Sequence, residues 1–215
     1  MSLFQLDPQS IANRARTAGS PVPSLQASIT RGMLGFTVVS VAGFVPWAVF
    51  GKWFHTHLGK NGEVGMYVAC AVVFLALTAP LLHRLIIGPG SMSRFYKLFG
   101  LSFTAYSIAW IAGWMALRGH PGSIAGLLAG TMVMACILVA AFDALRVVVK
   151  VFFALFVLNS IGYFVGGLSE AALIKAYPLV AKLSWGLFYG LGFGAGLGLA
   201  FHICQARARK LLAGG

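Results

Sequence analysis

Residues 183–204 read LSWGLFYGLGFGAGLGLAFHIC, an apolar run interrupted only by small residues and one histidine near its end. Four of its glycines are spaced four residues apart and fall on one face of a helix: Gly186, Gly190, Gly194 and Gly198. His202 continues that face, and Gly192, Gly196 and Ala200 form a second stripe beside it. In water each glycine costs a helix about 1 kcal/mol relative to alanine. In a bilayer small residues let helices approach closely, so the run predicts a tightly packed membrane helix.

The composition places the whole chain in the same environment. Its 215 residues are 59% hydrophobic and only 9% charged, with mean hydropathy +0.87, whereas soluble domains are roughly 25% charged. The apolar stretches are continuous and about twenty residues long, which favours helices over a barrel. Because the positive charges lie at the ends of these stretches, we attribute the net charge of +12 to membrane orientation and anionic phospholipids. Nucleic acid is not an expected partner.

The predicted fold is an all-α integral membrane protein, a compact bundle of six transmembrane helices. Its six apolar runs are 33–51, 64–82, 98–117, 122–142, 147–168 and 183–204. Six crossings place both termini on one side of the membrane. Eleven basic residues fall on that side: Arg14, Arg16, Arg31, Arg84, Arg94, Lys97, Arg146, Lys150, Arg207, Arg209 and Lys210. The other side has five, namely Lys52, Lys60, Arg118, Lys175 and Lys182. This excess predicts a cell inner-membrane protein with cytoplasmic termini.

The sequence divides into a cytoplasmic segment (1–30), a six-helix domain (31–206) and a basic tail (207–215). Within the first segment, Asp7 and Pro8 predict a helix start and Gly19 a helix stop. This short helix lies on the membrane surface in one interpretation. In the other, the segment is a frayed, solvated tail.

Two connections are less regular. Between the fourth and fifth runs the only break is 143–146, so either these residues turn tightly or the fourth helix continues to Lys150. After the fifth run, 167–178 predicts a short interfacial helix capped by Ser169, with Pro178 opening the last membrane helix.

Glycine stripes recur in the fourth and fifth runs: Gly122, Gly126, Gly130, Gly162 and Gly166. Since these stripes and that of 183–204 all lie toward the outer side, we expect the fourth, fifth and sixth helices to pack together there. A sliding surface or a contact with another subunit is the alternative.

Polar residues at two depths are candidates for a ligand site. At the cytoplasmic face we expect a cluster of His83, Arg84, Asp143, Arg146 and His202. It would be a structural clamp with phospholipid contacts, or a gate for transport, because an ionisable group near hydrocarbon needs a partner. Near mid-membrane, the amide of Asn159 must find a hydrogen-bond partner. It would clamp helices together or line a solute site.

The histidines also allow a different class of function. His83 and His202 share the cytoplasmic depth, and His55, His57 and His120 share the outer one. Paired imidazoles from two helices hold b-type haem, so haem or pigment binding is the rival hypothesis. No metal site is expected, since Glu63 is the only acid near the outer histidines. The three cysteines lie in apolar runs without metal-ligand spacing.

No enzyme motif is found, and four acidic residues offer few candidates for acid–base catalysis. We therefore expect a non-enzymatic membrane protein, either a small-solute transporter or channel or a membrane subunit of a larger complex.

Overall fold

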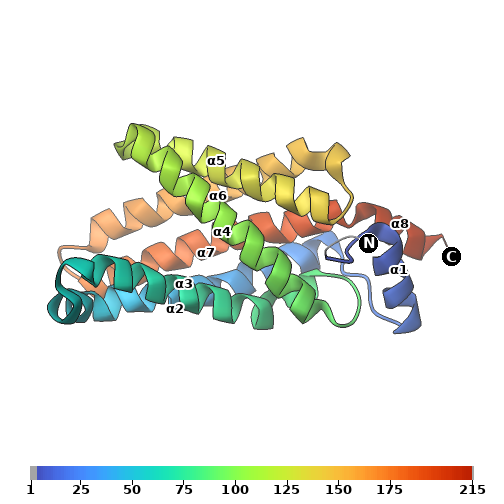
Figure 1. Ribbon diagram of the computed structural model, residues 1–215, viewed down its shortest axis with the longest axis horizontal. Coiled ribbons are helices and arrows are strands. Elements are labelled where there is room, and N and C mark those ends of the chain that lie inside the picture. Colours follow the sequence, from blue (N-terminus) through green and yellow to red (C-terminus); the bar gives the residue numbers. More distant parts are fainter. Residues whose placement is uncertain (1–3, 215) are drawn as a thin grey trace.

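The computed structural model describes residues 4–214, and in that range the fold consists of helices and the turns between them (Figure 1). The eight α-helices are α1 (Pro8–Thr17), α2 (Leu25–Leu58), α3 (Gly62–Leu82), α4 (Ser91–Leu117), α5 (Gly119–Ala141), α6 (Val148–Leu173), α7 (Pro178–Cys204) and α8 (Ala206–Ala213). Short 3-10 turns occupy Gly59–Asn61, His83–Leu85 and Leu145–Val147. The long helices run back and forth along an elongated bundle. We call the end that carries α1 and α8 proximal and the opposite end distal.

Several of these helices are long and apolar enough to cross a membrane. They are the helical segment 25–85, α4, α5, α6 and α7. Large apolar side chains cover their outward faces: Leu168 is 72% exposed, Val64 64% and Ile108 63%. A helix that is apolar all round lies in a core or in lipid. These faces have no protein partner among residues 4–214, so they are suited to lipid.

Helix α7 is the centre of the bundle. One face lies on α2, where a Cβ at Gly194 would collide with the backbone of Gly32 and a Cβ at Gly198 with that of Ser28. The opposite face lies on α6, where Gly192 meets the backbone of Gly162. The two stripes of 183–204 therefore contact two different helices, and α7 is held between them.

The expectation that the fourth, fifth and sixth helices pack together through their stripes is confirmed for the fifth and sixth, α6 and α7, where Gly162 meets Gly192, and is wrong for the fourth, α5. The α5 stripe faces α4, where a Cβ at Gly122, Gly126 or Gly130 would meet Trp114, Trp110 or Tyr106. Helices α5 and α7 barely touch. The turn at 118–119 pairs α4 with α5 as a hairpin, and large α4 aromatics fill the groove that the α5 glycines leave. The α2 partner was missed because its small residues, Ser28 and Gly32, are few.

The two irregular connections are resolved differently. Helix α5 ends at Ala141, and the chain turns tightly through Asp143, whose φ is 51°, so the fourth helix does not continue. The expected interfacial helix after the fifth run is absent, because α6 continues to Leu173. Ser169 caps nothing and instead donates a hydrogen bond to the Ser184 hydroxyl on α7, 2.9 Å away. Pro178 does open α7, as predicted.

The N-terminal helix is not a frayed tail. Asp7 caps it, accepting a hydrogen bond from the Ser10 amide at 2.9 Å. Helix α1 then packs against α8, burying Ile11 and Ala15, and Arg16 donates to the carbonyl of Leu211. The two terminal helices thus cover the proximal end together (Figure 1).

The close contact of α7 with α2 predicts opposite outcomes for two glycine-to-alanine changes. Gly194→Ala should lower the melting temperature of the detergent-solubilised protein, because the added methyl meets backbone and overpacking costs about 1–3 kcal/mol. Gly167→Ala in α6 is the matched control, since its methyl has nothing within 4 Å. It should be neutral, or more stable by up to about 1 kcal/mol. Equal effects of both changes would contradict the proposed contact.

Candidate functional site

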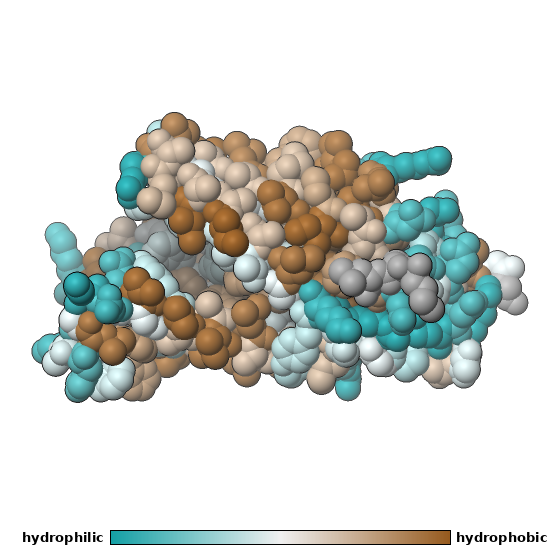
Figure 2. Space-filling model, in the orientation of Figure 1, coloured by the Kyte–Doolittle hydropathy of each residue, from teal (hydrophilic) through white to brown (hydrophobic). Residues whose placement is uncertain are grey.

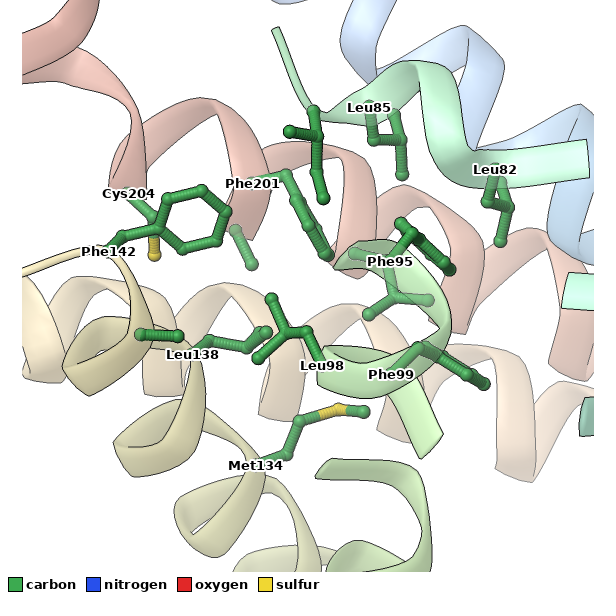
Figure 3. Packing of buried hydrophobic residues seen from close by; sticks show 14 of the residues in the cluster. Leu82, Leu85, Phe95, Leu98, Phe99, Met134, Leu138, Phe142, Phe201 and Cys204 are labelled. Atoms are coloured by element: carbon green, nitrogen blue, oxygen red, sulfur yellow. The ribbon is translucent and has the colours of Figure 1, made fainter. Parts of the chain in front are cut away.

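The proximal half of the bundle is closed by large apolar side chains. Figure 3 shows rings from α4, α7 and the α5–α6 turn pointing toward one another. Phe95 stacks on Phe201 with ring centroids 5.5 Å apart, and Phe142 meets Phe201 edge-on at 5.6 Å. All three are essentially without exposure. Such packing leaves no polar path along the axis of this half.

A buried amide fastens this closed half to the α3–α4 connection. Gln205, only 2% exposed, accepts a hydrogen bond from the Ile87 amide (2.9 Å) and donates to the carbonyls of Leu85 (2.8 Å) and Phe201 (3.0 Å). Sequence patterns do not single out this residue. Its only signal is a single amide between an apolar run and a basic tail, a position at which glutamine is usually solvated.

Replacing Gln205 by leucine keeps the volume but removes all three bonds. The Ile87 amide and the Leu85 carbonyl would then be buried without partners, at about 1–3 kcal/mol each. We expect Gln205→Leu to lower the free energy of unfolding by at least one such penalty, measured by thermal or denaturant unfolding. Gln26→Leu, at an exposed site in α2, is the control and should change little. No loss of stability in Gln205→Leu would show that these bonds are not formed.

The expected cytoplasmic cluster does not assemble. The αL conformation of Asp143 directs its carboxylate to the surface, where it pairs with Arg207 at 3.3 Å with both side chains about two-thirds exposed. Arg146 is exposed on the following turn. His202 instead faces Ser28 of α2, 3.5 Å from its hydroxyl. Hydration and a tail arginine stabilise Asp143, so it needs no partner from within the bundle.

His83 and Arg84 lie in a separate place. The Nδ1 atom of His83 is 3.0 Å from the Ala79 carbonyl, and both side chains line a cavity at the surface of the proximal end. His83 and His202 thus have different hydrogen-bond neighbours, the Ala79 carbonyl and the Ser28 hydroxyl, and haem binding by this pair stays a prediction. At the distal end His57 stacks on Trp53 and His120 on Phe164. No group of three metal ligands comes together within residues 4–214.

The second candidate, Asn159, lies in the centre of the bundle. It is fully buried in α6 and donates from Nδ2 to the Tyr106 hydroxyl on α4, 3.0 Å away. Its Oδ1 has no hydrogen-bond partner among the described residues. If the amide oxygen and nitrogen were assigned the other way round, Nδ2 instead of Oδ1 would lack a hydrogen-bond partner. Tyr189 of α7 places a second buried phenol beside Tyr106. This cluster is uncharged and holds one unsatisfied amide group.

Other hydroxyl side chains within the membrane-length runs differ from Asn159. Thr131 donates to the Leu127 carbonyl of its own helix at 2.6 Å, so its hydroxyl is satisfied without a ligand. Thr104 is exposed. The Ser160 hydroxyl, like that of Ser40 on α2, is buried without a partner in the described part of the chain.

The distal half opens toward this cluster. Figure 2 shows a hollow between α3 and the α4–α5 hairpin, over the region that α6 and α7 cross in Figure 1. Helix α3 touches α4 far less than α4 touches α5. A chain of half-buried rings joins four helices in this half: Trp47 to Trp185 (5.9 Å), Trp185 to Tyr163 (5.7 Å) and Tyr163 to Trp110 (6.1 Å). These four rings thus provide flat apolar surface near the uncharged polar cluster of Asn159, Tyr106 and Tyr189.

Comparison with known proteins returns nothing: no family model, curated protein or solved structure matches this chain. Within the bundle of apolar helices, the candidate site therefore combines a chain of aromatic rings with a neutral amide–phenol cluster.

Proposed function

We propose that the chain crosses the membrane six times, with both termini in the cytoplasm of a cell with an inner membrane. Segment 25–85 contains α2 and α3, which run antiparallel and contact each other along their lengths, so it supplies two crossings. With α4–α7 it gives six. The proximal end carries the basic C-terminal tail, the turn that contains Arg84 and the turn that contains Arg146. It is the cytoplasmic face, because basic residues favour that side.

We further propose that the protein is a non-enzymatic small-solute transporter. The observation that carries this proposal is the unsatisfied amide of Asn159 at mid-membrane. A buried polar group without a partner costs free energy, and a solute offering a hydrogen bond to it removes that cost. Transporters place such sites near the midplane, between packed helices.

The surroundings of Asn159 restrict the solute. The cluster contains no charged side chain, and rings line the approach from the distal side. A small, neutral solute with a flat face and at least one hydrogen-bonding group matches both features. An ion would be desolvated there without a compensating charge.

The same geometry supports alternating access. Helices α2, α6 and α7 form one block joined by glycine contacts, whereas the α4–α5 hairpin contacts the block less. With the proximal half closed by Phe95, Phe142 and Phe201, the structure corresponds to an outward-open state. Rocking of the hairpin against the block would close the hollow and open the proximal half.

Uptake into proteoliposomes tests the proposal, with radiolabelled uracil and adenine, which are flat and neutral, as the solute panel. Wild type should accumulate at least one member above protein-free vesicles. Asn159→Leu should abolish that uptake because it removes the polar end of the site. Thr131→Val, which removes a buried hydroxyl already satisfied within α5, is the matched control and should retain uptake.

Two results would overturn this function. Uptake unchanged in Asn159→Leu would remove the proposed site. Absence of uptake across the panel, together with a Soret band after expression with haem supply or a stoichiometric co-purifying chain, would establish the haem or complex-subunit alternative instead.

A further inference from the structure

The proximal end carries a cavity of about 450 Å³ that the sequence analysis did not foresee. Two stretches of the chain form it: residues 20–31, which include the α1–α2 linker and the first part of α2, and residues 83–92, which include the turn His83–Leu85, the loop after it and the start of α4. The lining includes Arg31, His83, Arg84, Gly90, Ser91 and Met92. Its volume lies within the range of small-molecule sites and leaves room for more than a single ion.

The charge of this cavity is entirely positive. Arg31 and Arg84 are exposed, and the one ion pair among residues 4–214 joins two other residues, Arg207 and Asp143. Nδ1 of His83 faces the Ala79 carbonyl and so donates to it, which leaves Nε2 to accept a hydrogen bond from a hydroxyl of a ligand. None of the four acidic residues of the chain lines the cavity. Two guanidinium groups at an uncompensated site fit a phosphate group.

Helix α4 adds a second positive element to the same wall. It begins at Ser91 after Gly90, no side chain caps it, and its first turn contains no acid. The free amides of a helix start carry partial positive charge and bind phosphate oxygens. The amides at the start of α4 line the same cavity as Arg31 and Arg84, so the helix end and the two arginines can bind one ligand.

The loop that builds the cavity is held in place. Gly88 (φ 94°) and Gly90 (φ 64°) adopt conformations that other residues disfavour. Arg94 donates to the carbonyls of Pro89 and Gly90, both at 3.0 Å, and Gln205 fastens Leu85 and Ile87. The site is thus preorganised.

We propose that this cavity binds the phosphate of an anionic phospholipid at the cytoplasmic leaflet. A free phosphate would use the same arginines, but the position favours a lipid. The cavity lies where α3 ends and α4 begins, at the depth of headgroups. Its rim carries exposed apolar side chains, Met92 at 42% and Leu81 at 41%, beside which acyl chains lie. Basic pockets between membrane helices on this side bind such headgroups. The inference rests on the proposed membrane orientation, which puts this end at the cytoplasmic leaflet, and is independent of transport.

Binding of short-chain lipids to the full-length detergent-solubilised protein tests the assignment. The probes are dihexanoyl phosphatidylglycerol, dihexanoyl phosphatidylcholine and inorganic phosphate, followed by native mass spectrometry and by the shift in melting temperature. Phosphatidylglycerol should bind and stabilise the wild type, phosphatidylcholine should bind more weakly, and phosphate alone should stabilise less than the lipid.

The double variant Arg31→Gln/Arg84→Gln should weaken phosphatidylglycerol binding at least about tenfold, since each lost contact is a charge-assisted hydrogen bond. Arg146→Gln/Lys150→Gln removes the same charge from exposed sites at the same end and should leave the affinity within about twofold. If the double variant does not fold, Arg84→Gln alone should show an intermediate loss.

Three results would overturn the proposal. Equal binding of the two lipids would show that the headgroup charge is not recognised. Stabilisation by inorganic phosphate as large as that by phosphatidylglycerol would identify a free-phosphate site. Equal weakening in both double variants would mean that only the general surface charge attracts the lipid.

Discussion

The backbone contacts of α7 with α2 and α6 are the constraint on which the rest of the bundle depends. Gly194 and Gly198 allow α2 to approach on one face, and Gly192 allows α6 to approach on the other. In lipid no hydrophobic drive brings helices together, so close van der Waals packing must supply the association. Three of the long helices therefore form one block, and the remaining hairpin is free to lean away from it.

That arrangement divides the molecule into two unlike halves. In the proximal half α4 and α5 lie against the block, and phenylalanine rings with Gln205 close the space between them. In the distal half the α4–α5 hairpin diverges from α3, and the interior is walled by rings over Asn159. The unsatisfied amide lies at the boundary, where a solute entering from the distal side would stop. The cavity that we propose to bind lipid lies at the other end, beside the loop that Gln205 holds.

Much of the fold follows from residue patterns, and much of the site does not. Apolar run length located the long helices, and Asp7 and Pro178 marked two of the helix starts. A glycine stripe, however, indicates only that another helix packs closely and not which helix it is. The α5 stripe was therefore assigned to the wrong neighbours. Asp143 was placed in a cluster at the cytoplasmic face because its depth could be predicted but not the conformation of its turn. Gln205 and Arg31 were overlooked because their partners lie far away in the chain.

The central claim is that the distal half is open to the outer solution down to the aromatic chain while the proximal half is sealed. Labelling with a membrane-impermeant maleimide in right-side-out vesicles tests it most directly. Single cysteines would replace Trp110 or Phe95 in a background in which Cys70, Cys136 and Cys204 are alanine. The account predicts rapid labelling at position 110 and none at position 95. Equal labelling at the two positions, or none at 110, would contradict it.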